Sequence, residues 1–224
     1  MAKPELPPRP IMARRLWRNR DFGLLFAAQI ISLLGSGATT VGLALFSYRL
    51  AGGSSATAVI GDALMLRILA FLLFSQPAGV IADRVSRKKV LVAADVIRFG
   101  LVGLFPFITE VWQVYLLIFA VNAVTAFFTP TFEASTPEVV GEEQYVKALS
   151  LARVAKALSL ARVAVDVEAV AAPALAGLLI ALLGVKWVFW FDALTYLVSA
   201  GLVLAAAVPR ARKGAKPLSG PTFL

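Results

Sequence analysis

The sequence contains no cysteine and no histidine among its 224 residues. Without cysteine, disulfide bonds and thiolate metal sites are excluded. Without histidine, the chain lacks the commonest general base and the commonest neutral metal ligand. It also lacks a glycine-rich phosphate loop after a strand, a His-Glu-x-x-His helix and a Gly-x-Ser-x-Gly turn. These absences argue against an enzyme, and we predict neither a cofactor nor a bound metal.

Charge is scarce as well. Charged residues make up 16% of the chain and hydrophobic residues 59%, and the mean hydropathy is +0.82. Soluble domains usually hold about 45–50% apolar residues, so most of this chain is expected to lie in lipid. A membrane-spanning helix needs about 20 residues. The length therefore accommodates six spans with loops and tails, and we predict an all-α membrane protein without a further soluble domain.

The predicted spans are the stretches with little or no charge. They cover residues 22–48, 58–82, 90–109, 111–132, 163–184 and 188–208, between basic tails at 1–21 and 209–224. Most of the 22 Lys and Arg residues fall in the tails and the inner loops, whereas the outer segments hold only Arg49 and Lys186. This asymmetry predicts that both termini are cytoplasmic, in a multi-pass protein of the plasma or inner membrane. The net charge of +9 thus orients the protein in the membrane and does not indicate nucleic-acid binding.

A basic segment joins the second and third predicted spans. It reads Gly-Val-Ile-Ala-Asp-Arg-Val-Ser-Arg-Lys-Lys over residues 79–89. This order resembles the loop signature of the major facilitator superfamily, Gly-x-x-x-Asp-(Arg/Lys)-x-Gly-x-(Arg/Lys)-(Arg/Lys), with Ser86 at the second Gly. The segment contributes Gly79, Asp83, Arg84, Arg87, Lys88 and Lys89. The resemblance implies that they help to hold one conformation of a transporter; an ordinary positively charged cytoplasmic loop is the alternative.

The whole chain resembles the N-terminal six-helix half of a major facilitator transporter. Residues 16–22, 95–98 and 191–196 make it most similar to bacterial drug and siderophore exporters of the enterobactin-exporter type. In the fifth span, Ala172, Pro173, Ala176 and Gly177 look like the antiporter motif Gly-Pro-x-x-Gly-Gly, with Ala at two Gly positions. The resemblance implies alternating access about a site near the bilayer midplane, and proton-coupled efflux of a small organic molecule such as a drug or siderophore.

Transporters of this family have two such halves. The resemblance therefore implies that the chain works with a second six-helix half, or with a second copy of itself in a homodimer. A truncated membrane protein or an interaction subunit, without transport activity, is the alternative.

Ionisable residues at membrane depth are costly and by default indicate function. The candidates for binding protons or substrate are Arg67, Asp95, Arg98, Asn122, Asp166, Glu168 and Asp192. Asp95 and Arg98 lie three residues apart on one helix, so they can form an ion pair, which could also be purely structural. Asp166 or Glu168 could carry a proton. Asp166 and Asp192 could instead lie near the membrane surfaces.

The substrate pocket is expected to draw on the first, second, fourth and fifth spans. Its polar candidates are Gln29, Ser32, Arg67 and Asn122, for which helix–helix contacts are the alternative. Arg67 lies about 22 Å along its helix from Ala82, which is too deep for easy access to water. It therefore needs an acid, a polar cavity or an anionic substrate.

The start of the fifth span carries a duplication. Residues 147–155 and 156–164 have the same sequence, Lys-Ala-Leu-Ser-Leu-Ala-Arg-Val-Ala. Nine residues lengthen a continuous helix by about 13.5 Å and turn it by roughly 900°. The repeat is expected either to extend the helix into the cytoplasm or to lie along the membrane surface. A duplication without function is the alternative.

Overall fold

The computed structural model describes residues 20–52, 55–141, 166 and 169–207, and all its elements in these ranges are helices. They are α2 (Arg20–Ala51), α3 (Ala56–Arg84), α4 (Arg87–Val102), the 3-10 helix η1 (Phe105–Phe107), α5 (Val111–Gly141), a helix Ala169–Leu183 and α7 (Val185–Ala205). Five described segments are long and apolar enough to cross a membrane, and Ala169–Leu183 is a shorter apolar helix. The predicted all-α membrane fold is confirmed. The duplicated segment and Glu168 lie outside the described residues.

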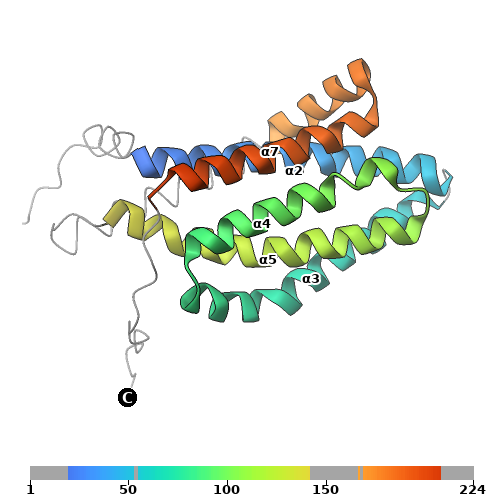
Figure 1. The fold of residues 1–224 in the computed structure, drawn as a ribbon. Coiled ribbons are helices and arrows are strands. Elements are labelled where there is room, and N and C mark those ends of the chain that lie inside the picture. Colours follow the sequence, from blue (N-terminus) through green and yellow to red (C-terminus); the bar gives the residue numbers. More distant parts are fainter. Residues whose placement is uncertain (1–19, 53–54, 142–165, 167–168, 208–224) are drawn as a thin grey trace, which may run out of the picture.

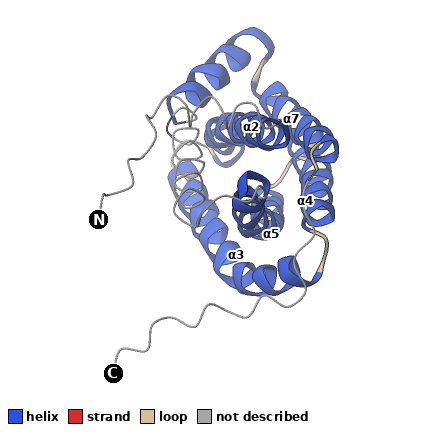
Figure 2. Cartoon of the chain, turned by 90° about the vertical axis from the view of Figure 1, so that its left-hand side faces the viewer, coloured by secondary structure: helices blue, strands red, loops and turns tan. Residues whose placement is uncertain are grey.

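The long helices run side by side in one bundle (Figure 1). α2 packs along α7, α7 along α4, α4 along α5 and α5 along α3. α2 also contacts α3 and α5, so the five helices close on themselves. In Figure 2, which looks along the bundle, α3 and α7 lie on opposite sides. Side chains that point inward from these two helices therefore face each other across the interior.

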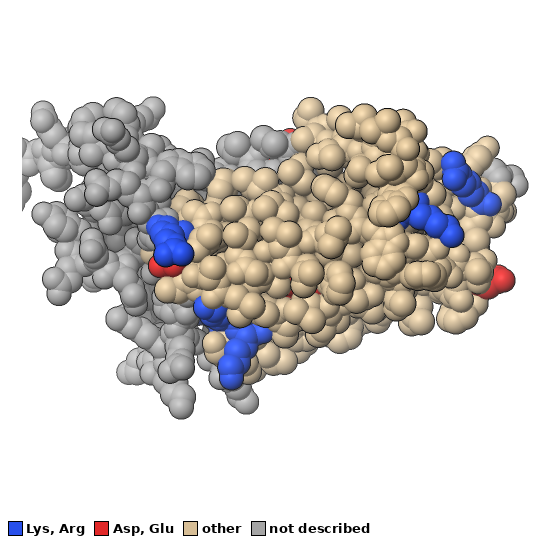
Figure 3. All heavy atoms as spheres, turned by 45° about the horizontal axis from the view of Figure 1, so that its top comes forward, with Lys and Arg blue, Asp and Glu red and all other residues tan. Residues whose placement is uncertain are grey.

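Many large apolar side chains are exposed on the outside of the bundle, most of all on α3. Figure 3 shows charged side chains gathered toward the two ends, with a broad and almost uncharged band between them. Such a surface suits hydrocarbon and not water. α3 is the most exposed helix, because only 17% of its central residues are buried, against 28–50% in the other four spans. It leaves the largest face for lipid or for a partner.

The helices extend beyond the predicted spans where α3 meets α4. α3 continues through Gly79 to Arg84 and α4 begins at Arg87, so only Val85 and Ser86 lie between them. Backbone hydrogen bonds close both ends, from Val85 N to Ile81 O at 2.9 Å and from Val90 N to Ser86 O at 3.1 Å. Charged residues end a lipid-embedded segment but do not end a helix. The basic signature is therefore mostly helical and not a loop.

The helix Ala169–Leu183 and α7 form a hairpin that turns at one residue. Gly184 has φ +95°, a conformation that residues with a side chain rarely adopt. Ala172 and Ala176 of the antiporter-like motif are buried, and Ala176 packs in a cluster that joins the hairpin to α2. Pro173 and Gly177 are exposed. The two alanines therefore serve close helix packing, while the other two motif residues face outward.

Small residues let α2 and α7 approach each other closely. Gly35 and Gly42 are buried on the same face of α2. A Cβ atom on Gly35 would collide with the side chains of Thr195 and Asp192, and one on Gly42 would lie 3.1 Å from a methyl group of Val188. Close approach through small residues is a common source of stability between helices in membranes.

Replacing Gly35 with Ala is expected to destabilise the bundle, because the added methyl group has no room unless α7 moves. We expect the substitution to lower the free energy of unfolding by roughly 1–3 kcal/mol. The measurement is the midpoint temperature of thermal unfolding in detergent, which should fall. Gly23→Ala on the same helix is the matched control, since no atom lies within 4 Å of its added Cβ. An equal effect of both substitutions would contradict the close approach of α2 and α7.

Candidate functional site

A cavity of about 260 Å³ lies inside the bundle, lined by α2, α3, α4, α5, α7 and Phe105 of η1. Its polar wall consists of Gln29, Ser32, Ser36, Thr39, Thr40, Arg67, Arg98, Asn122, Thr125, Thr129, Asp192 and Tyr196. The four residues predicted for a polar pocket thus face one cavity. The predicted choice of helices is partly wrong. α4 and α7 contribute Arg98 and Asp192, whereas none of the described lining residues comes from Ala169–Leu183.

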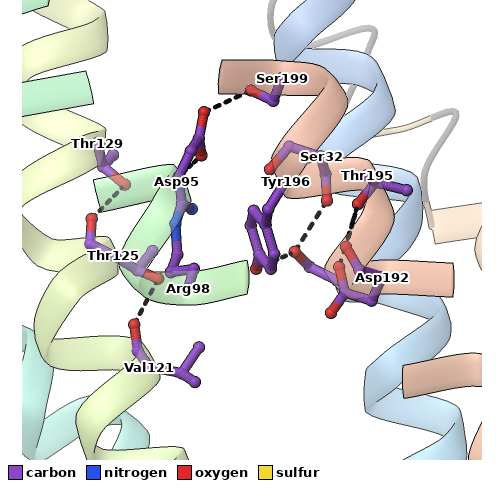
Figure 4. A network of polar contacts seen from close by, with 11 residues as sticks. Ser32, Asp95, Arg98, Val121, Thr125, Thr129, Asp192, Thr195, Tyr196 and Ser199 are labelled. Atoms are coloured by element: carbon purple, nitrogen blue, oxygen red, sulfur yellow. Dashed lines mark hydrogen bonds and ion pairs between the residues drawn. The ribbon is translucent and has the colours of Figure 1, made fainter. Parts of the chain in front are cut away.

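Asp95 and Arg98 form a buried ion pair on α4 (Figure 4). Arg98 Nη2 donates to Asp95 Oδ1, and the two residues are 3% and 0% exposed. Ser199 on α7 donates its hydroxyl to Asp95 Oδ2 at 2.7 Å. The local pair predicted from the sequence is confirmed. It also connects α4 to α7, which the spacing of the two charges did not predict.

Two aromatic rings hold the guanidinium group of Arg98. Its central carbon lies 4.1 Å from the centre of the Phe128 ring and 4.5 Å from that of Tyr196. Such contacts are attractive, and more so where water is excluded. Tyr196 in turn shares a hydrogen bond of 2.8 Å with Ser36 on α2. Arg98 is therefore fixed by α4, α5 and α7 together, while its Nε has no hydrogen-bond partner among the described residues.

Asp192 faces the same cavity from α7 and is 1% exposed. Thr195, one turn further along α7, has its hydroxyl oxygen 3.3 Å from Asp192 Oδ1. Asp192 is thus buried among helices, and its depth in the membrane stays a prediction. Because α7 begins at Val185 and not near residue 188, Asp192 lies about two turns inside the helix.

Arg67 and Asn122 line the cavity from α3 and α5. Asn122 donates from Nδ2 to the Ile118 carbonyl at 2.8 Å, which leaves its side-chain oxygen available as an acceptor. Arg67 is exposed, and its side chain makes no hydrogen bond or ion pair with any other described residue. The sequence argument that Arg67 needs a polar cavity or an anion is consistent with this position.

The basic residues at the start of α4 donate to backbone carbonyl groups of two other segments. Arg87 is buried and donates to the Ala134 carbonyl of α5 at 3.0 Å. Lys88 donates to the Ala206 carbonyl, directly after α7, at 2.8 Å. A cation at a helix C-terminus also interacts favourably with the helix dipole. Lys89 is exposed. This segment therefore joins three helices at one end of the bundle.

Several other candidates lie apart from the cavity. Gly79 is half-buried in α3, and Asp83 and Arg84 belong to the last turn of that helix, where only the backbone is described. Asp166 is exposed, and Glu168 lies outside the described residues. In the described part of the chain, no group of three or more acidic residues could hold a metal ion.

The sequence analysis missed Tyr196 and Ser199. A signal was present, because Asp192, Thr195, Tyr196 and Ser199 follow one another at helical spacing and form a polar stripe on one face of α7.

Comparisons with known proteins agree with this architecture. The sequence profile described as Major Facilitator Superfamily matches residues 25–222. The chain is 26% identical to macrolide efflux protein A of Streptococcus pyogenes over 87% of its own length and 46% of that protein. It is 35% identical to the uncharacterized MFS-type transporter YkuC of Bacillus subtilis over 61% of its own length and 32% of that protein.

A further relative is macrolide efflux protein A of Enterococcus faecalis, which is 27% identical over 69% of the chain and 46% of that protein. The chain thus spans at most about half the length of the curated relatives it matches. No solved structure matches it significantly.

The ion pair predicts non-additive stability effects. Asp95→Asn removes the carboxylate that pairs with the buried charge of Arg98. We expect it to lower the free energy of unfolding by about 3–5 kcal/mol. Adding Arg98→Met removes the uncompensated charge and should restore most of that loss. Thermal unfolding of the single and double variants in detergent gives the interaction energy between Asp95 and Arg98. Additive losses would show that the two charges do not depend on each other.

Proposed function

Since the chain belongs to the major facilitator superfamily of membrane transporters, we propose that it is one half of an exporter for small organic molecules. The observation that carries this proposal is the cavity of about 260 Å³ between apolar helices, lined by Arg67 and by the buried charges of Arg98 and Asp192. Binding sites of such transporters lie near the bilayer midplane, between helices. The two macrolide efflux relatives favour outward transport.

Transport by alternating access needs a second body against which this bundle can rock. We propose a second six-helix unit, either another polypeptide segment or a second copy of the chain. The exposed face of α3 supports this proposal, because that helix is the least buried of the spans and carries the unpaired Arg67 into the cavity. A membrane subunit without transport activity remains the rival function, which the transport experiment below separates.

The buried charges suggest how a proton gradient drives export. Asp95 has both an arginine and a hydroxyl donor as partners. Asp192 is equally buried, but it forms no ion pair with a described residue: the side chains beside it are the neutral Thr39 and Thr195, and Arg98, which acts on it only through its charge, is paired with Asp95. A buried carboxylate without a cation is costly in the membrane, and binding a proton removes that cost. We therefore assign the transported proton to Asp192.

Proton-driven transport can be measured in proteoliposomes with an imposed pH gradient, using a macrolide and a panel of small organic cations, anions and zwitterions as substrates. Asp192→Asn is expected to abolish the part of transport that depends on the gradient and to leave the thermal unfolding midpoint nearly unchanged. Asp166→Asn is the control, since Asp166 is exposed, and Glu168→Gln tests the other acid considered from the sequence. Gradient-driven transport that persists in Asp192→Asn would remove Asp192 from the mechanism. Absence of any transport by the unmodified chain would favour the rival function.

The proposed orientation places both termini in the cytoplasm. Because the chain has no cysteine, single cysteines introduced at Lys3, Arg49 and Lys213 report on one position each. In intact cells, a membrane-impermeant maleimide should label Arg49→Cys only. Lys3→Cys and Lys213→Cys should react after the membrane is permeabilised. The reverse labelling pattern would show the opposite orientation.

A further inference from the structure

Two charges of opposite sign face the cavity without forming an ion pair with a described residue. Arg67 points to it from α3 and Asp192 from α7, on opposite sides of the bundle (Figure 2). No ion pair joins them within the described residues, where the salt bridge inside the bundle is that of Arg98 with Asp95. These four charges sum to zero. Arg98 also lines the cavity, but Asp95 neutralises it, so the charges outside an ion pair are Arg67 on the side of α3 and Asp192 on the side of α7.

The uncharged polar side chains present mainly acceptors. Ser36, Thr40, Thr125 and Thr129 each donate their hydroxyl hydrogen to the carbonyl four residues earlier in their own helix, at 2.8–3.2 Å. Only oxygen lone pairs remain for a ligand on the three threonines, and the Ser36 oxygen already shares a hydrogen bond with Tyr196. The side-chain Oε1 of Gln29 is buried without a donor. Away from Arg67 and Arg98, the wall therefore suits a ligand that donates hydrogen bonds, such as an ammonium group.

We propose that the cavity binds a zwitterionic organic molecule, with its ammonium group at Asp192 and its carboxylate at Arg67. The inference rests on the proposed function, because it takes the cavity as the transport site and names the class of molecule that fits it. Phe105, Phe128 and Tyr196 line the same cavity and offer apolar contact to a flat ligand body.

A ligand with only one charge fits this cavity less well. An amine without an acid leaves Arg67 without an anion, and an acid without an amine leaves Asp192 without a cation. An uncompensated charge away from water is costly, so each missing group lowers affinity. The ammonium group also takes the place of the proton on Asp192. The ligand arrives already protonated and the displaced proton leaves to water, which links ligand binding to proton release at one carboxylate.

Three matched probes test the proposal. 6-(Aminomethyl)-2-naphthoic acid is zwitterionic, its methyl ester carries only the positive charge, and its N-acetyl derivative carries only the negative charge. Binding is measured by equilibrium dialysis against the whole chain in lipid nanodiscs, with empty nanodiscs as the blank. We expect the zwitterion to bind at least about tenfold more tightly than either derivative, from the usual strength of a charged hydrogen bond.

Variants assign each end of the zwitterion. Arg67→Gln should lower the affinity for the zwitterion by about tenfold and change the affinity for the methyl ester by no more than about twofold. Arg67→Lys should restore most of the lost affinity for the zwitterion. Asp192→Asn should lower the affinity for the zwitterion to that for the N-acetyl derivative. Arg49→Gln, at the exposed end of α2, is the matched control and should leave the affinities for all three probes unchanged.

Equal binding of zwitterion and ester, or an Arg67→Gln variant that binds the zwitterion normally, would overturn the role of Arg67. Binding of all three probes at the level of empty nanodiscs would overturn the ligand class itself. Because this assay needs no transport, loss of pH-driven transport with the binding preference intact would count against the exporter and not against the ligand class.

Discussion

The guanidinium group of Arg98 is the constraint on which the interior of the bundle depends. A charge of this kind inside a membrane bundle must be neutralised and separated from lipid. Here Asp95 neutralises it, while Phe128 and Tyr196 enclose it. Because these groups come from α4, α5 and α7, one charge fixes the relative position of three helices. Ser199 extends the constraint by binding the second oxygen of Asp95.

The cavity follows from this arrangement together with the contact of α2 and α7. Gly35 allows α2 to approach the side chains of Asp192 and Thr195, and the hydrogen bond between Ser36 and Tyr196 joins the same two helices. α3 lacks an equally close contact with α4 or α7 and packs mainly on α5. The interior is therefore tightly closed on the side of α2, α4 and α7. Its space lies toward α3, where Arg67 enters it.

The sequence predicted what local patterns determine, and missed what depends on contacts between distant segments. The all-helical membrane fold and the Asp95–Arg98 pair follow from hydropathy and from a spacing of three residues, and both are confirmed. The contact from Ser199 to Asp95 spans 104 residues, and no local spacing encodes it. The sixth helix was predicted to start near residue 188 because charge alone set its start, whereas Lys186 is in fact the second residue of α7. Hydropathy marks where lipid ends and not where backbone hydrogen bonding ends.

The position of Asp192 also bears on how binding and movement could be coupled under the proposed function. Its carboxylate lies against Gly35 of α2, where an added Cβ would collide with the polar side chains of Asp192 and Thr195. A proton or a ligand cation at Asp192 changes the charge at this contact by one unit, without any need for a signal over a long distance. The effect reaches α4 through Tyr196 and Arg98, since both side chains face the same cavity and touch each other. At its basic end α4 is held to α5 and to the end of α7 by Arg87 and Lys88. A change at Asp192 is therefore expected to move these helices as one body and not to bend a single helix within it.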